Sequence, residues 1–266
     1  MAIAGFVERL AGRDAWGALG REVARWRRAG HAPCLWWRDD DARRPCAALE
    51  RLCALSATHG APVALAVIPD VDLTELAAAI APWPLVRAIQ HGCDHVDRNQ
   101  GGGFSAEFSP ASPPEEIAAV IEAAWARLKS ATNAAPIYAP PWNVVTDNVS
   151  TALVRTPLEA VSLYGAERNA AGGLPQINAH LDIMRWRPAR FRGSAVILRR
   201  LSDLLRARRR SAAWDEPVGI LTHHRNLDPD AWEFLAALLD WSTAEASQVR
   251  WRSADALLEG VRASAL

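Results

Sequence analysis

The sequence lacks the charge excess of a nucleic-acid or membrane-surface protein. Its 30 Lys and Arg balance 30 Asp and Glu, so the formal net charge is zero. Proteins that coat nucleic acid or anionic lipid gain affinity from a clear basic excess. No stretch approaches the ~18 uninterrupted apolar residues of a membrane span. We therefore expect neither nucleic acid nor a membrane as a partner.

Lysine and paired cysteines are also scarce. The single lysine, Lys129, ends a helical pattern and is the only candidate for a lysine nucleophile. The four cysteines form no C-x-x-C pair and no zinc-knuckle spacing, which predicts free, buried thiols. Charged residues Glu8 and Arg9 interrupt the position where an export signal needs its apolar core. These absences predict a cytoplasmic protein.

Apolar residues make up 50% of the 266 residues, which is enough for a large core. After an amphipathic helical pattern, short apolar runs alternate with further helical patterns. The strand-like runs are 33–37, 63–68, 85–90, 136–139, 158–163, 176–181, 218–221 and 249–252. The alternation predicts one α/β domain over 1–266, with 1–30 as a helical extension, and leaves a barrel and a doubly wound sheet as alternatives.

Three helices have readable start signals. Residues 112–115 read Ser-Pro-Pro-Glu, a capping box with proline in the first turn, ahead of a helix over 117–128. Asp228 and Pro229 open a helix over 231–241, and Ser253 is expected to cap the last helix.

Polar side chains collect where the predicted strands end. Parallel α/β folds place their functional groups at the carboxyl ends of strands. The segments at such positions are 38–41 (Arg-Asp-Asp-Asp), 91–95 (His-Gly-Cys-Asp-His), 139–143 (Ala-Pro-Pro-Trp-Asn), 180–182 (His-Leu-Asp) and 222–224 (Thr-His-His). Three adjacent carboxylates repel one another unless a cation offsets them. His91 and His95, spaced i and i+4, could hold such a cation together with a carboxylate from another strand.

Taken in order, these segments resemble the five motifs of the polysaccharide deacetylases, the NodB-homology family-four carbohydrate esterases. The motif residues are 37–40, 91–95, 139–142, 180–182 with Trp186, and 220–223. The resemblance extends from about residue 33 to the last strand and helix. It implies a distorted (β/α) barrel with seven or eight parallel strands, in agreement with the strand count.

The resemblance also implies roles for individual residues. Asp40, His91 and His95 would hold a divalent metal, with zinc as the expected ion. Asp39 would be the general base, His223 the general acid, and Asp182 would tune His223. Five residues are expected to line the substrate site: Pro141, Trp142, Asn143, His180 and Trp186. The backbone N–H near Trp142 would help hold the oxyanion, while a structural role is the alternative for His180.

Two departures from the family pattern leave alternatives open. The first motif reads Asp-Asp-Asp-Ala where the family has Asp-Asp-Gly, so a second register would make Asp40 the base and Asp41 the ligand. The first register is preferred. The third motif has Ala139 where the family has an arginine that pairs with the base, and Arg38 or Arg185 could replace that arginine.

The resemblance implies a metal-dependent hydrolase that removes an N-acetyl, or less commonly an O-acetyl, group from a carbohydrate. Because no export signal is evident, a small-molecule or oligosaccharide substrate is expected rather than a cell-wall polymer. Two alternatives stay open. One is a metal-dependent amidase that acts on a non-sugar C–N bond, and the other is a barrel that only binds acetylated glycan, which the alanine at position 139 would permit.

Overall fold

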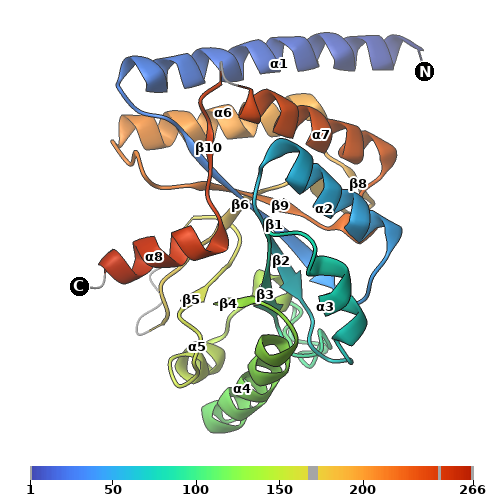
Figure 1. Cartoon of the computed structure of the whole chain (residues 1–266), viewed down its shortest axis with the longest axis vertical. Helices are drawn as coiled ribbons and strands as arrows, with labels where there is room; N and C mark the ends of the chain where they lie inside the picture. The colour runs from blue at the N-terminus through green and yellow to red at the C-terminus, as the bar shows by residue number, and fades with distance from the viewer. Residues whose placement is uncertain (1, 167–172, 245–246, 265–266) are drawn as a thin grey trace.

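The computed structural model describes residues 2–166, 173–244 and 247–264, and its architecture is a curled parallel sheet surrounded by helices (Figure 1). The strands are β1 (Cys34–Ala42), β2 (Val63–Val67), β3 (Val86–His91), β4 (Ala134–Ala139), β5 (Ala160–Val161), β6 (Ala179–Asp182), β7 (Met184–Trp186), β8 (Ala189–Phe191), β9 (Val218–Thr222) and β10 (Arg250–Trp251). The α-helices are α1 (Ala2–Arg28), α2 (Ala47–His59), α3 (Thr74–Ile80), α4 (Pro114–Ala131), α5 (Asp147–Leu153), α6 (Ser194–Arg210), α7 (Pro229–Thr243) and α8 (Ala254–Ser264).

The main sheet follows the order β5-β4-β3-β2-β1-β9-β6, and β10 pairs with the start of β1. All of these pairs are parallel. Isolated parallel bridges, Val161 with Gln176 and Tyr164 with Ala179, connect the two ends of the path. The expected distorted (β/α) barrel is confirmed, and each of the eight strand-like runs overlaps one of its strands.

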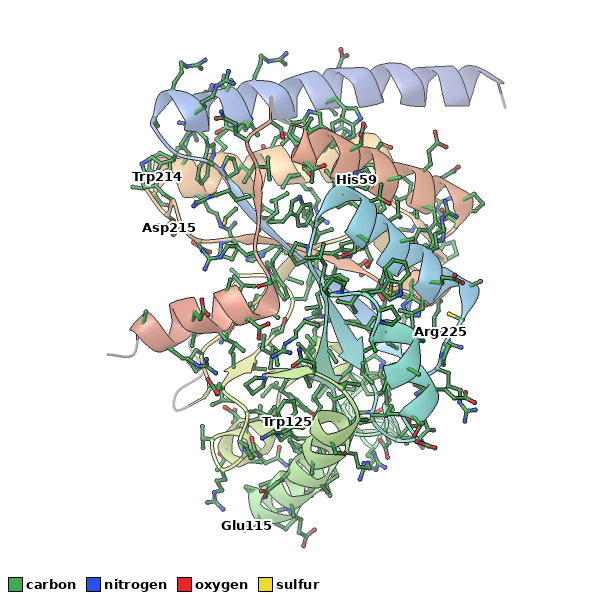
Figure 2. All side chains as sticks on the ribbon, viewed as in Figure 1. His59, Glu115, Trp125, Trp214, Asp215 and Arg225 are labelled. Carbon is green, nitrogen blue, oxygen red and sulfur yellow. The ribbon has the colours of Figure 1, made fainter. Side chains whose placement is uncertain are left out.

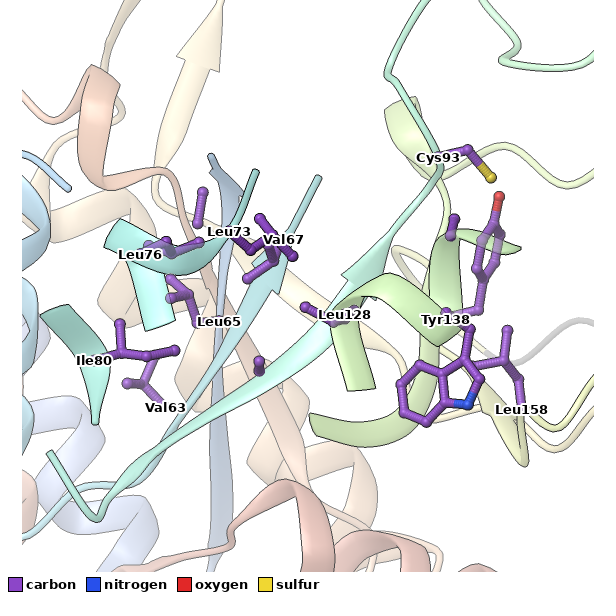
Figure 3. Packing of buried hydrophobic residues seen from close by; sticks show 14 of the residues in the cluster. Val63, Leu65, Val67, Leu73, Leu76, Ile80, Cys93, Leu128, Tyr138 and Leu158 are labelled. Carbon is purple, nitrogen blue, oxygen red and sulfur yellow. The ribbon is translucent and has the colours of Figure 1, made fainter. Parts of the chain in front are cut away.

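The two faces of the sheet bury different side chains. Val63, Leu65 and Val67 of β2 pack against α3 through Leu76 and Ile80, as Figure 3 shows. The alternate positions of β2, Ala64 and Ala66, belong to a second cluster, which also contains residues of α8. Because both faces are buried, the strands read as continuous apolar runs, which is why the sequence revealed them.

The N-terminal helix α1 lies within the expected helical extension 1–30 and packs against α6. Leu19, Val23 and Trp26 are buried in one cluster with α6 and α7. The indole N–H of Trp26 donates to the carbonyl of Leu205 at 3.2 Å, and its ring meets Trp214 edge-on. Helix α1 therefore covers one end of the molecule (Figure 1).

The helix-start predictions have mixed outcomes. The carboxylate of Asp228 accepts from the N–H of Ala231 at 2.8 Å, and Ser253 Oγ accepts from Ala256 at 3.2 Å, so both caps are confirmed. The predicted capping box at 112–115 does not form. The N-cap of α4 is Pro113 instead of Ser112, and no side chain caps the helix, because the proline side chain has no hydrogen-bond acceptor.

A two-stranded hairpin, β7 and β8, follows β6 and was not predicted. Its strands have three residues each and bear exposed arginines instead of an apolar alternation. The four cysteines are free, and three of them are buried. No helix in the described part of the chain is long and apolar enough to cross a membrane.

Candidate active site

The carboxyl ends of several strands meet at a pocket of about 630 Å³. Its lining residues are Asp40, Asp41, His91, His95, Trp142, Asn143, Val144, Tyr164, Asp182, Trp186, Arg192, Leu221 and His223. The structure thus brings together most of the residues that the sequence motifs singled out. The exceptions are Asp39, Pro141 and His180, which do not line this pocket.

Asp41, His91 and His95 form the one group in the described residues whose donor atoms could together hold a metal ion. Their ligand atoms all lie within 4.8 Å of one another. Asp41 Oδ1 is 3.1 Å from His91 Nε2 and 3.4 Å from His95 Nε2. Two imidazole nitrogens and a carboxylate oxygen are a donor set that divalent transition metals accept, with positions left for water. The residues therefore fit the expected cofactor.

The first expected register placed Asp40, and not Asp41, beside the histidines. The difference arises in the backbone of β1, where the pairing with β2 shifts register between Asp39 and Ala42. Asp41 adopts a left-handed conformation with φ of 70°, which aspartate tolerates better than most residues. This irregularity breaks the strict alternation of a strand, so Asp40 and Asp41 both line the pocket.

The charges of this group shift one another's protonation. Burial raises the pKa of Asp41, but the hydrogen bond with His91 and the nearby imidazoles outweigh burial and hold this pKa well below its ordinary value. Burial lowers the pKa of His91, and the carboxylates of Asp40 and Asp41 reverse this and raise it. Burial and the neighbouring His91 lower the pKa of His95. Without metal, the carboxylate of Asp41 is thus stabilised by the imidazoles around it.

Asp39 lies behind the pocket in a hydrogen-bond network of its own. Its Oδ2 accepts from the Thr222 hydroxyl at 2.5 Å and from the N–H of His224 at 3.0 Å. Its Oδ1 is 2.5 Å from His224 Nδ1. Both carboxylate oxygens are engaged and the residue is 0% exposed. The structure therefore does not place Asp39 where it could reach a substrate, and this arrangement matches the second register rather than the first.

Asp40 is paired with an arginine side chain, although position 139, where the family pattern has an arginine, is an alanine. Arg38 Nη2 donates to Asp40 Oδ2 at 2.9 Å and to the amide oxygen of Asn143 at 2.6 Å. Arg38 Nη1 is held by the carbonyl and hydroxyl of Ser162, each at 2.8 Å. Arg38 is fully buried, and the alternative candidate, Arg185, is exposed on β7. Of the two replacements considered for the missing arginine, the structure places Arg38 beside Asp40.

His223 faces the same pocket from the end of β9. Its Nε2 is 3.9 Å from Asp40 Oδ2, and its ring lies edge-on to Trp186 with a centroid distance of 4.5 Å. Asp182 accepts from the indole N–H of Trp186 at 2.7 Å and from the N–H of Met184 at 2.8 Å. Burial raises the pKa of Asp182, and His223 partly offsets the shift. Asp182 therefore positions Trp186 against His223.

The segment after β4 forms the opposite wall. Pro141–Asn143 is a short 3₁₀ turn in which Trp142 and Asn143 have φ of 54° and 57°. Trp142 is 38% exposed, and its ring lies 4.5 Å from that of His95. Pro141 is buried under the turn and close to Gly92. An exposed indole at the edge of a pocket offers a flat apolar face to a ligand.

His180 lies elsewhere. It lines a separate pocket of about 480 Å³ with Asn178, Pro217 and Arg252. Its Nδ1 accepts from the N–H of Gly219 at 3.0 Å. Burial and the nearby Arg208 lower its pKa to about 4, so the imidazole is neutral near pH 7. The geometry agrees with the structural alternative for His180.

Glu107 is a site residue that the sequence motifs did not reveal. Its Oε1 accepts from the consecutive N–H groups of Cys93, Asp94 and His95 at 2.8, 2.9 and 2.7 Å. A Cβ on Gly92 would lie 2.5 Å from the same Oε1, and Gly92 has φ of 61°. A glycine is therefore required for the carboxylate to enter the loop. Glu107 fixes the loop between the two histidines, including His95 at φ of 59°.

Comparison with known proteins gives matches by structure and none by sequence. No family model and no curated protein matches the chain. A protein of Mycobacterium smegmatis assigned to the polysaccharide deacetylases matches with a TM-score of 0.55 and 16% identity, over 82% of this chain and 78% of that one. The peptidoglycan deacetylase PdaC of Bacillus subtilis matches with a TM-score of 0.52 and 11% identity, over 88% and 93%. The T48 deacetylase, solved with substrate, gives 0.50 and 14%, over 87% and 93%.

These likenesses establish the architecture of the chain. It has the (β/α) barrel fold seen in the polysaccharide deacetylases, at low sequence identity. The resemblance drawn from five short motifs is therefore confirmed at the level of the fold. Activity and residue roles depend on the geometry of the pocket itself.

Proposed function

We propose that this chain is a metal-dependent hydrolase that removes an N-acetyl group from a carbohydrate. The observation that carries the proposal is that one pocket combines the donor set of Asp41, His91 and His95 with an acid–base pair, Asp40 and His223. This is the combination that amide hydrolysis requires: a site for a Lewis acid, a base for water and an acid for the leaving nitrogen. The second register, with Asp40 as base and Asp41 as ligand, is the one proposed.

A divalent cation, when bound, would lower the pKa of water and polarise the carbonyl of the acetyl group. The expected ion is zinc, since its common ligands are imidazole nitrogens and carboxylate oxygens. Asp41, His91 and His95 would hold it, and the buried Nδ1 of His91 is already oriented by the carbonyl of Ala139 at 2.9 Å. Such an outer hydrogen bond fixes the tautomer that leaves Nε2 free to coordinate.

Asp40 is the proposed acceptor for the proton of the attacking water. Its Oδ2 is held by Arg38, while its Oδ1 is buried and has no hydrogen-bond partner in the described residues. A buried carboxylate oxygen without a partner is costly unless a ligand satisfies it. The water oxygen adds to the acetyl carbon as its proton passes to Oδ1.

His223 is the proposed acid that protonates the leaving group. Protonated Nε2 gives its proton to the sugar nitrogen as the C–N bond breaks, so that acetate and a free amine leave. Its ring orientation is maintained by Trp186, which Asp182 holds by a hydrogen bond. The backbone N–H near Trp142 is proposed to donate to the oxygen that gains charge, and the faces of Trp142 and Trp186 to contact the sugar ring.

The position of Arg38 favours catalysis over simple glycan binding. The binding-only alternative depended on the arginine missing at Ala139. Arg38 supplies a guanidinium to Asp40 from within β1, at 2.9 Å. The base therefore has the partner that the family pattern gives it, from a different strand.

The test is acetate release by the full chain from N-acetylated chitooligosaccharides. Metal-stripped protein is expected to be inactive and to regain turnover on addition of one equivalent of zinc. His91→Ala is expected to bind no metal and to release no acetate. His59→Ala, a matched change at the far end of α2 (Figure 2), is expected to behave as wild type.

Two outcomes would contradict the proposal. Stoichiometric metal without hydrolysis of any acetylated sugar would support the binding barrel. Hydrolysis of simple acetamides, with acetylated sugars untouched, would support the amidase alternative. Release of O-acetyl rather than N-acetyl groups would change the bond but keep the metal, base and acid assignments.

Glu107→Gln is expected to weaken metal binding without removing a ligand. A carboxylate that accepts three backbone N–H groups is a strong acceptor, and a neutral amide bonds them less well. Outer groups that orient ligands contribute roughly 10- to 100-fold to metal affinity, so we expect the zinc Kd to rise about tenfold. The measurement is competition with a chromophoric chelator.

Glu116→Gln, an exposed carboxylate on α4, is the matched control and should leave the Kd unchanged. An unchanged Kd in Glu107→Gln, in protein with wild-type secondary structure, would show that the loop around His95 keeps its shape without this carboxylate.

A further inference from the structure

The hairpin at the edge of the pocket concentrates positive charge. Residues 183–192 read Ile-Met-Arg-Trp-Arg-Pro-Ala-Arg-Phe-Arg, with four arginines and no acidic residue. We name Arg185, Arg187, Arg190 and Arg192 the arginine rim. The whole chain has zero formal net charge, so this local excess is not a consequence of composition.

The arginine rim adjoins the proposed active site. Trp186 of β7 lines the pocket and contacts His223, and Arg192 lines the pocket from the end of β8. Arg192 Nε donates to the carbonyl of Asp182 at 3.0 Å, which holds the guanidinium at the pocket wall. The other rim arginines are exposed.

Within the described residues, the three exposed rim arginines have no carboxylate partner. Arg185 and Arg190 are direct cross-strand partners in the antiparallel pair, so two like charges share one face of the hairpin. No hydrogen bond or ion pair involves the side chains of Arg185, Arg187 and Arg190 within residues 2–166, 173–244 and 247–264. Arginines elsewhere, such as Arg98 and Arg262, pair with carboxylates.

Like charges placed directly across a strand pair destabilise it. An anion bound from solution would relieve that repulsion and would gain from several guanidinium groups at once. Since the rim adjoins the pocket in which the acetyl group is proposed to react, the anion with the best access is the substrate itself.

We infer that the arginine rim selects carbohydrates that bear carboxylate or phosphate groups next to the acetylated sugar. The inference rests on the proposed function for the position of the acetylated sugar. Trp186 and Trp142 contact that sugar, Arg192 meets a charge inside the pocket, and the exposed rim arginines meet charges on neighbouring units. Guanidinium groups suit both anions because their planar donors match two oxygens at a time.

Binding to matched probes tests the inference. Hyaluronan tetrasaccharide carries N-acetylglucosamine and glucuronate, whereas tetra-N-acetylchitotetraose carries the same N-acetyl sugar without charge. The second pair is N-acetylglucosamine 1-phosphate and N-acetylglucosamine. Binding is measured by calorimetry on zinc-loaded Asp40→Asn protein, in which turnover is slowed.

The charged probe of at least one pair is expected to bind roughly tenfold tighter at low salt, as two or three exposed ion pairs would give. The advantage should shrink at high salt, because exposed charges are screened. Arg185→Gln/Arg190→Gln is expected to remove most of it, and Arg192→Gln a further part. Arg199→Gln/Arg200→Gln, the same charge change on exposed positions of α6, should keep it.

Equal affinity for charged and neutral probes in both pairs would overturn the inference. So would a preference that survives in the variant lacking Arg185, Arg190 and Arg192. If the arginines only protect the hairpin edge from pairing, Arg185→Gln/Arg190→Gln would aggregate while its soluble fraction kept the preference. Because this experiment measures binding and not acetate release, a failure of acetate release leaves its result readable.

Discussion

Asp40→Asn is expected to lower kcat for acetate release by about a thousandfold, since general acid–base catalysis contributes roughly 10²–10⁴, and to leave zinc bound. The amide keeps the shape of the carboxylate and a hydrogen-bond acceptor for Arg38, but it cannot take a proton from water. The three ligand atoms of Asp41, His91 and His95 are untouched. Initial rates and metal content of the same preparation are the two measurements.

Asp39→Asn separates the two registers. Asp39 is fully buried and pairs with His224, so this change is expected to lower stability by about 3 kcal/mol, the cost of breaking a buried charge pair. The folded fraction should keep its metal and most of its turnover. Loss of metal in Asp40→Asn, with wild-type metal content in an inactive Asp39→Asn, would restore the first register.

The strands and the barrel were predictable because strands that are buried on both faces are apolar along their whole length. Both faces of the parallel sheet are covered, so each strand appears as an apolar run between helical patterns. Polar residues could then be assigned to strand ends by position alone. His91 and Trp142 were assigned to strand ends in this way, and both line the pocket.

The register of the three aspartates was not predictable from the sequence. Strict alternation would give Asp39 and Asp41 the same face and Asp40 the other. A left-handed residue at Asp41 and a shift in pairing put Asp40 and Asp41 in the pocket instead. Sequence patterns carry no signal for such an irregularity when the residue is not glycine.

Two further features of the site, the position of Glu107 and the pairing of Arg38, depend on contacts between residues that are distant in the sequence. Glu107 reaches the loop around His95 from twelve positions away along the chain, within a segment that has no periodic pattern. The pairing of Arg38 with Asn143 joins strand ends far apart in sequence. The one available signal was Gly92 within the histidine motif, since glycine between metal ligands indicates close approach by another group.

Asp41→Ala is expected to weaken zinc binding at least a hundredfold, because loss of a direct ligand should exceed the roughly 10- to 100-fold effect of an outer-shell group. The change removes the only charged donor of the set and leaves two imidazoles 5.2 Å apart between ring centroids. Turnover should be lost together with the metal, whereas Asp40→Asn is expected to lose turnover and keep the metal. Chelator competition gives the Kd, and the rise in melting temperature on zinc addition, which follows from preferential binding to the folded state, should disappear.

Acid should weaken zinc binding in wild-type protein in a way that reports on the same residue. Asp40 and Asp41 raise the pKa of His91, and a protonated imidazole cannot coordinate, so zinc affinity should fall as pH drops through the raised pKa of His91. Removing Asp41 takes away one of the two carboxylates that raise this pKa. The residual zinc binding of Asp41→Ala should therefore persist to lower pH than that of wild type, relative to its own maximum. If Asp41→Ala kept the wild-type affinity for zinc, Asp41 would not be a ligand, and His91 and His95 would have to bind the ion with another residue.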